Sequence, residues 1–240
     1  MKQKTLFISF GAVFLAVTLV CSMLFRTIES SFLLEAPANT EVAQSPVIIL
    51  DAGHGGEDGG ATGTNGVVEK DLNLSMTRGL AALLRLAGYT VVETRTEDKL
   101  LYPVGTQKGH KKQGDLTGRL AFTKQYPNSL FISIHMNTFP TPSCEGIQVW
   151  YSQNHEASKE LASAVQTEVK ARLQPSNHRK IKAATSNIYI LRHAKTPAIL
   201  IECGFLSTPA ECERLCDPLY RQELMLALFA AISQKTALPT

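Results

Sequence analysis

Short apolar runs alternate with longer amphipathic segments from Val47 to the end of the chain. The apolar runs predict strands beginning at Val47 and over Thr90–Arg95, Leu130–Ile134, Gly146–Tyr151, Ile188–Leu191 and Ala198–Ile201. The amphipathic segments predict helices over Asp71–Leu86, Leu116–Tyr126, Glu156–Leu173, Pro209–Cys216 and Leu219–Gln234. Alternating strands and helices favour an α/β fold with three layers, in which helices flank a mostly parallel sheet.

The N-terminal region has a different pattern. Lys2 and Lys4 precede an apolar run from Leu6 to Phe25, and about 20 apolar residues can cross a bilayer as a helix. We predict a signal or membrane anchor over residues 1–29, a linker over 30–46 and one folded domain over 47–240. An A-x-A sequence, Ala36-Pro37-Ala38, follows too far behind the apolar run for a typical cleavage site, which favours a retained anchor over a cleaved signal. Both interpretations place the domain outside the cytoplasm, either anchored or secreted.

Charge and cysteine content exclude some functions and leave others open. The net charge is only +3 and no arginine-rich stripe is present, so the sequence does not indicate nucleic-acid binding. The five cysteines are an odd number, so at least one free thiol is expected, while others can form bridges in an exported protein. Cys212 and Cys216 have metal-like spacing, but no C-x-x-C motif and no nearby histidine supports a zinc site there.

Histidines follow two of the predicted strands, at the point where the apolar run ends. The apolar run VIIL ends in Asp51 and breaks into the glycine-rich turn that carries His54, and the strand LFISI runs directly into His135. Strand ends of this kind form one edge of a parallel sheet, where α/β proteins bind ligands. Glu69 precedes the first predicted helix, so its loop is expected over the same edge.

Two histidines and one glutamate are a ligand set that suits a catalytic zinc. Such sites keep three protein ligands and one open position, at which the metal activates water near neutral pH. His54, Glu69 and His135 meet this requirement, although a single histidine on a loop is more often only a polar surface residue. The combination at strand ends favours the metal site.

Glu202 stands between the apolar sequences AILI and CGFL. A buried carboxylate without a partner costs several kcal/mol, so this residue needs a structural partner or a chemical role. A buried salt bridge or a cap is the structural explanation. The functional explanation is a general base and acid that moves a proton during hydrolysis.

Other polar residues carry weaker predictions. Asn137 is a candidate substrate-binding residue or a loop cap, and Asp51 and Glu57 are candidates to orient the ligand imidazoles. His193 follows the predicted strand IYIL and is a minor alternative ligand. The chain contains neither a G-x-S-x-G nor an H-E-x-x-H sequence, so the serine-hydrolase and helix-borne protease motifs are absent.

Four sequence blocks together resemble one known family. LDAGHGGEDGG, NGVVEKDLNL, FISIHMN and AILIECGFLS occur in this order between about Val47 and Gln234. They are similar to the zinc-dependent N-acetylmuramoyl-L-alanine amidases of the third amidase type. The resemblance implies that His54, Glu69 and His135 bind Zn²⁺, that Glu202 is catalytic, and that residues 47–240 are the amidase domain. The implied reaction cleaves the amide between N-acetylmuramic acid and L-alanine in peptidoglycan.

The layout and the G-T-Q-K-G and L-T-G-R-L-A-F sequences resemble the spore-cortex branch, the CwlD-type germination-specific amidases. This implies a role in making muramic-δ-lactam during cortex maturation, with an activating or deacetylase protein as a possible partner. Cys203 stands where the family often has a small apolar residue, and a thiol there is expected beside Glu202. The alternatives are another peptidoglycan metallohydrolase, such as a sugar deacetylase, or an inactive wall-binding protein of the same fold.

Overall fold

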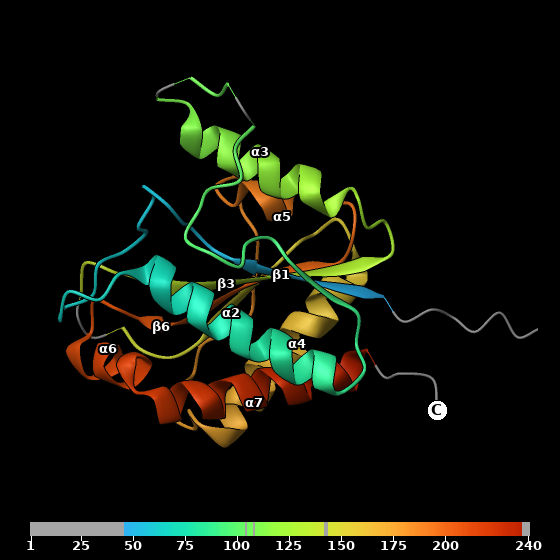
Figure 1. Cartoon of the computed structure of the whole chain (residues 1–240). Coiled ribbons are helices and arrows are strands. Elements are labelled where there is room, and N and C mark those ends of the chain that lie inside the picture. The colour runs from blue at the N-terminus through green and yellow to red at the C-terminus, as the bar shows by residue number, and fades with distance from the viewer. Residues whose placement is uncertain (1–45, 104, 108, 142–143, 237–240) are drawn as a thin grey trace, which may run out of the picture. The chain divides into compact units, whose positions relative to one another are not determined.

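The computed structural model describes residues 46–103, 105–107, 109–141 and 144–236 (Figure 1). Apart from residue 46, the predicted anchor and linker lie outside the described residues. No helix within the described ranges is both long enough and apolar enough to span a membrane.

One six-stranded sheet organises the domain. Its strands are β1 (Val47–Ala52), β2 (Val91–Glu93), β3 (Ser129–Asn137), β4 (Gln148–Tyr151), β5 (Lys182–Ala183) and β6 (Ala198–Phe205). Their order across the sheet is β2-β1-β3-β6-β4-β5, and every neighbouring pair is parallel except β4 and β6. The mostly parallel sheet of the sequence prediction is therefore confirmed. The carboxyl ends of β1, β3 and β6 meet at one edge.

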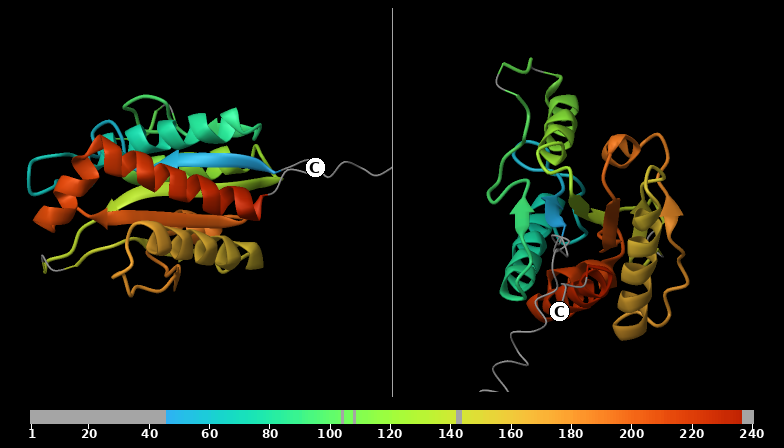
Figure 2. Two further views of the ribbon diagram at one scale, coloured as in Figure 1. Left: turned by 90° about the horizontal axis from the view of Figure 1, so that it is seen from below. Right: turned by 90° about the vertical axis from the view of Figure 1, so that its right-hand side faces the viewer.

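Helices cover both faces of this sheet, but unequally (Figures 1 and 2). The helices are α2 (Glu69–Leu86), α3 (Lys111–Thr123), α4 (Glu156–Arg172), α5 (Tyr189–His193), α6 (Pro209–Cys216) and α7 (Pro218–Lys235). We call the side that carries α2, α4, α6 and α7 the four-helix face, and the side that carries α3 and α5 the two-helix face.

Alternation along the strands divides the core between these faces, because successive strand residues point to opposite sides. Leu50, Ile132 and Ile201 join the large cluster that packs against helix residues such as Leu80 and Leu228. A smaller cluster on the two-helix face contains Ile49, Phe131 and Ala198 from the sheet, together with Ile190 and Leu191 from α5. The four-helix face thus carries most of the apolar burial.

The first helix begins two residues earlier than its predicted start at Asp71, so that Glu69 is its first residue. Its end is as predicted. Gly88 has a φ of 90° and donates its N–H to Arg85 O at 3.0 Å. A left-handed glycine in this position ends many helices, because it lacks the Cβ that would clash.

Three local predictions are corrected by the structure. The predicted strand Ile188–Leu191 is wrong: this segment forms the short helix α5, whose buried Ile190 and Leu191 cover the sheet. A short apolar run cannot separate a buried strand from one buried helical turn, so the helix was missed. The sequence pattern predicts no strand over Lys182–Ala183, which form β5. His135 and Glu202 lie inside β3 and β6 rather than after them.

Candidate metal centre and active site

His54 lies in the turn that follows β1. Among the described residues, His54 is the one non-glycine residue with a left-handed backbone, with a φ of 61°. Its Nε2 lies 3.3 Å from Glu69 Oε1, and its Nδ1 lies 2.9 Å from Asp58 Oδ2. Burial lowers the pKa of His54, but the two carboxylates outweigh burial and raise it to about 8.

Glu69 reaches the same point from the first turn of α2. Its side chain is 3% exposed, and Oε1 accepts hydrogen bonds from Met136 N at 3.1 Å and Asn73 Nδ2 at 3.2 Å. Oε2 accepts from Ala61 N at 2.8 Å. Burial raises the pKa of Glu69, but His135 and the other imidazole outweigh it and hold this pKa far below its usual range. Glu69 is therefore a fixed, charged carboxylate.

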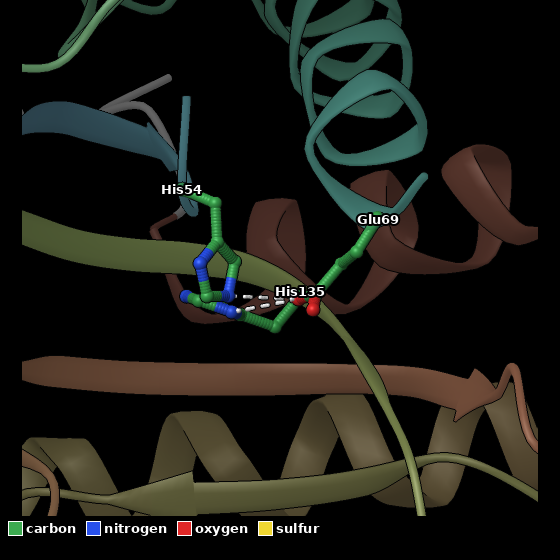
Figure 3. A group of neighbouring side chains, drawn as sticks. All are labelled: His54, Glu69 and His135. Carbon is green, nitrogen blue, oxygen red and sulfur yellow. Dashed lines mark hydrogen bonds and ion pairs between the residues drawn. The ribbon is translucent and has the colours of Figure 1, made fainter. Parts of the chain in front are cut away.

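His135 completes the group from β3. Its Nδ1 lies 3.0 Å from Glu69 Oε1, and its ring centroid is 5.0 Å from that of His54. Figure 3 shows all three side chains pointing toward one another from β3, the β1 turn and the start of α2. One ligand atom from each residue lies within 4.8 Å of the others, so the three can hold a metal ion. Sequence reasoning had selected this same set.

Gly53 is the residue that makes room for this arrangement. A Cβ built at Gly53 would lie 2.2 Å from Cε1 of His135. Any side chain at this position would displace the ring. The glycine before His54 is thus required by the imidazole of the neighbouring strand.

Glu202 lies beside the metal-ligating group on the adjacent strand. It is the register partner of His135, so both side chains project from the same face of the sheet. Within the described part of the chain, its Oε2 is buried and has no hydrogen-bond partner. Burial raises the pKa of Glu202 to about 7, with the Glu69 charge adding to the increase and the imidazoles opposing it. Such a group can exchange a proton near neutral pH.

A cavity of about 240 Å³ opens at this edge on the two-helix face. His54, His135 and Glu202 are among the residues that line it. Apolar side chains from β3, β6, α3, α5 and the residue before α5 also line it and are the following: Leu116, Phe131, Ile188, Tyr189, Ile190, Leu191 and Leu200. The cavity thus places the imidazoles and the free carboxylate oxygen beside a partly apolar space.

The other predicted polar residues have different surroundings. Asn137 accepts a hydrogen bond from Thr138 N at 2.8 Å and does not line the cavity, so its substrate role stays a prediction. Asp51 contacts Arg119, Ser133 and Thr94, and Glu57 pairs with Lys111.

Neither predicted carboxylate touches an imidazole of the site. Asp58, which the sequence analysis does not select, is instead the carboxylate that contacts Nδ1 of His54. Asp58 is four residues after His54, and the backbone bridge between Gly55 and Asp58 turns it back. The glycine-rich turn was the only sequence signal for this return.

Cys203 does not lie beside the Glu202 side chain, which corrects the expectation that its thiol is found there. It is fully buried in the cluster of the four-helix face, because consecutive strand residues point to opposite sides. The described cysteines, Cys144, Cys203, Cys212 and Cys216, are all free thiols. His193 is exposed, contacts the ring of Tyr189 and is not part of the group His54, Glu69 and His135.

Comparison with known proteins identifies the family. The model of the N-acetylmuramoyl-L-alanine amidase family matches residues 48–234. The germination-specific N-acetylmuramoyl-L-alanine amidase of Bacillus subtilis (strain 168) is 35% identical over 188 residues, which cover 78% of each protein.

Solved structures agree with this match. The CwlD amidase from Clostridioides difficile, solved in complex with the GerS lipoprotein, has a TM-score of 0.76 and 34% identity; the match covers 81% of this chain and 100% of that one. The amidase AmiC2 of Nostoc punctiforme has a TM-score of 0.67 and 26% identity, covering 79% and 96% respectively. The chain therefore belongs to the N-acetylmuramoyl-L-alanine amidase family, and within that family it resembles the CwlD type.

Proposed function

We propose that this chain is a zinc-dependent amidase in which His54, Glu69 and His135 hold Zn²⁺ and Glu202 moves the proton. The observation that carries the proposal is their convergence: three ligand atoms lie within 4.8 Å of one another, and Glu202 is the register partner of one ligand. Two imidazoles and a carboxylate are donors that zinc accepts, which supports the fit. When bound by three protein ligands, zinc supplies a Lewis acid and a nucleophile at neutral pH.

The surroundings of the two glutamates support a division of roles. Glu69 is held charged by several donors, as a ligand requires, whereas Glu202 has an unpartnered oxygen and a pKa of about 7. Glu202 Oε2 accepts a proton as the water oxygen bonds to the carbonyl carbon of the lactyl amide. The same oxygen then gives this proton to the alanine nitrogen as the C–N bond breaks. The products are a free lactyl carboxylate and a stem peptide with an L-alanine amino terminus.

The biological setting is proposed from the relatives and the N-terminal sequence. The names of the two most informative relatives refer to germination and to a complex with a lipoprotein. We therefore place this chain in spore-cortex maturation, where it acts on peptidoglycan and leads to muramic-δ-lactam, with a partner protein. The apolar segment within residues 1–29 supports a location on the outer side of a membrane. In this proposal a linker over 30–46 connects that segment to the catalytic domain over 47–240.

The test uses the full chain and intact peptidoglycan, with and without zinc, and identifies released fragments by mass spectrometry. We expect stem peptides with a free L-alanine amino terminus, and their loss when a chelator is added. Glu202→Gln is expected to keep the metal and lose hydrolysis, whereas His54→Ala loses both. Retained metal in His54→Ala would contradict the ligand set, and release of acetate would indicate a deacetylase instead.

Glu211→Gln is the matched control for Glu202→Gln. Glu211 is also a buried glutamate with a raised pKa, caused mainly by burial. Its carboxylate, however, accepts hydrogen bonds from Gly146 N and Phe205 N and does not line the cavity. We expect Glu211→Gln to retain hydrolysis. If only Glu202→Gln loses activity, the loss reports the proton-transfer role of Glu202.

A further inference from the structure

Two buried arginines bind the backbone that carries His54. Arg119 donates to Ala52 O at 2.8 Å and to His54 O at 2.7 Å. Arg95 donates to Ala52 O at 2.9 Å and to Gly53 O at 3.0 Å. Both side chains are nearly inaccessible, with 2% and 1% exposure for Arg119 and Arg95. Three successive carbonyls, from the last residue of β1 to His54, therefore have guanidinium donors in a buried setting.

These bonds determine the orientation of His54. A residue's φ and ψ are set once the two peptide planes that flank its Cα are fixed. Arg95 holds the plane before His54 through Gly53 O, and Arg119 holds the plane after it through the His54 carbonyl. The left-handed φ of 61° is unfavourable for a residue with a side chain, so the surroundings must impose it.

The same network reaches the other two ligands. Asn73 Nδ2 lies 3.1 Å from Gly53 O and 3.2 Å from Glu69 Oε1, so one amide bridges the His54 backbone and the carboxylate ligand. Gly53 N donates to Ile134 O, directly before His135, at 3.1 Å. Arg95 also donates to Lys70 O, in the first turn of α2, at 2.8 Å. Arg95 and Arg119 thus belong to one hydrogen-bond network that reaches the backbone or side chain of all three ligands.

Charge balance allows the two guanidiniums to be buried together. Arg119 forms ion pairs with Asp51 and, at 2.7 Å, with Asp115. Thr94 and Ser133 donate further hydrogen bonds to Asp51 at 2.6 Å each. A planar guanidinium with several fixed donors can bind carboxylates and carbonyls at the same time, which the ammonium of lysine cannot reproduce.

We propose that Arg119 and Arg95 are positioning residues of the metal centre, which hold the His54 backbone in the strained conformation that aims its imidazole at Glu69 and His135. They act through the backbone of the ligand rather than as ligands themselves. This inference rests on the zinc site of the proposed function.

The test measures zinc affinity directly and needs no substrate. Zinc dissociation constants of the full chain are measured by competition with a chromophoric chelator for the unaltered protein, Arg119→Lys and Arg95→Lys. Visible absorption after loading with Co²⁺ reports the ligand geometry. Leu84→Ala is the control for lost stability, because Leu84 is fully buried near the far end of α2 and contacts the large core.

We expect either lysine variant to bind zinc about 10- to 100-fold more weakly and to change the Co²⁺ spectrum, as loss of ligand support does elsewhere. Leu84→Ala is expected to melt at a lower temperature but to keep the zinc dissociation constant within about twofold, because it removes only packing. Should one lysine variant fail to fold, the other still decides.

Unchanged affinity and spectrum in a folded lysine variant would overturn the positioning role while leaving the zinc site intact. Equal weakening in Leu84→Ala would also overturn it, because the effect would then follow stability alone. Absence of zinc binding in the unaltered protein would overturn both this inference and the proposed metal site.

Discussion

The two faces of the sheet use burial for different purposes. On the four-helix face, aliphatic side chains from the strands pack against α2, α4 and α7 in one large cluster. On the two-helix face, buried charges such as Asp51 and Arg119 lie beside a smaller apolar cluster, and a cavity opens at the strand ends. The first face stabilises the sheet by apolar burial, which is not directional. The second uses directional hydrogen bonds and ion pairs to orient a few side chains.

This difference separates neighbours in the sequence. Cys203 and Glu202 are adjacent, yet the thiol is in the large core and the carboxylate lines the cavity. Substitutions on the four-helix face should therefore change mainly the free energy of unfolding. Substitutions on the two-helix face should change mainly metal binding and catalysis.

The largest effect is expected for Gly53→Ala on the two-helix face. The new Cβ would lie 2.2 Å from Cε1 of His135, so the imidazole must turn away from the metal centre. We expect no measurable hydrolysis and zinc binding weakened by at least about 100-fold, both measured on the purified full chain. Gly66→Ala is the control for lost stability alone, because its φ of 85° disfavours alanine while no atom lies within 4 Å of the added Cβ. Normal zinc affinity in Gly53→Ala would refute the steric argument.

A large but different effect is expected for Leu80→Ala on the four-helix face. Leu80 is fully buried, and removing its isobutyl group leaves a cavity in the main core. We expect a loss of about 2 to 5 kcal/mol in the free energy of unfolding, measured with urea. At temperatures where the variant is folded, kcat should remain within about twofold of the unaltered protein, since Leu80 packs in the main core, 11 residues along α2 from Glu69. A large fall in kcat would show that the faces are coupled.

An intermediate effect that depends on pH is expected for Glu202→Gln in the presence of a chelator. The folded protein holds a proton on Glu202 up to about pH 7, whereas the unfolded chain releases it near the ordinary value of 4.5. Since the folded state binds the proton more tightly, the unaltered protein loses stability as the pH rises from 4.5 to about 7.

The glutamine variant lacks this titration. Its stability relative to the unaltered protein should therefore increase by about 2 to 3 kcal/mol between pH 4.5 and pH 8, since each tenfold change in proton affinity corresponds to about 1.4 kcal/mol. Urea unfolding at a series of pH values measures this difference. A difference that does not vary with pH would mean that Glu202 is not held in its neutral form by burial.

The smallest effect is expected for Cys203→Ala. Its sulfur is buried on the four-helix face, so the substitution removes one small group from the core. We expect a loss of about 1 kcal/mol in stability and unchanged zinc affinity and kcat, measured by urea unfolding, chelator competition and peptide release. A change in zinc affinity would contradict the position of the thiol on the opposite face from Glu202, which the strand alternation predicts.

The hydrophobic pattern was sufficient to predict the α/β class, most strands and most helices, because periodicities of about two and 3.6 residues report burial directly. It failed for the segment around Tyr189, where one apolar turn of helix covers the sheet and has too few residues to show a period. Three of the four candidate site residues were predictable because His54, His135 and Glu202 follow or interrupt apolar runs. Their roles remain proposals.

The residues that support those ligands were not predictable in the same way. Asp58, Arg95 and Arg119 are charged residues in segments that read as ordinary turns, strand ends or helix surface. Only the folded chain brings Arg95 and Arg119 to the carbonyls of residues 52–54, across 42 or more sequence positions. Nothing in the local sequence marks such a contact.

The sequence by itself determined most of the strands and helices, the apolar character of the sheet, and the choice of two histidines and a glutamate that follow apolar runs, because these depend on local patterns of burial. The tertiary structure decided that Asp58 contacts His54 and that Cys203 points to the opposite face from Glu202. It also decided which arginines bind the carbonyls of the turn that carries His54. Those outcomes depend on the register between strands and on hydrogen bonds between distant segments, since buried charges and carbonyls must find partners wherever the fold brings them.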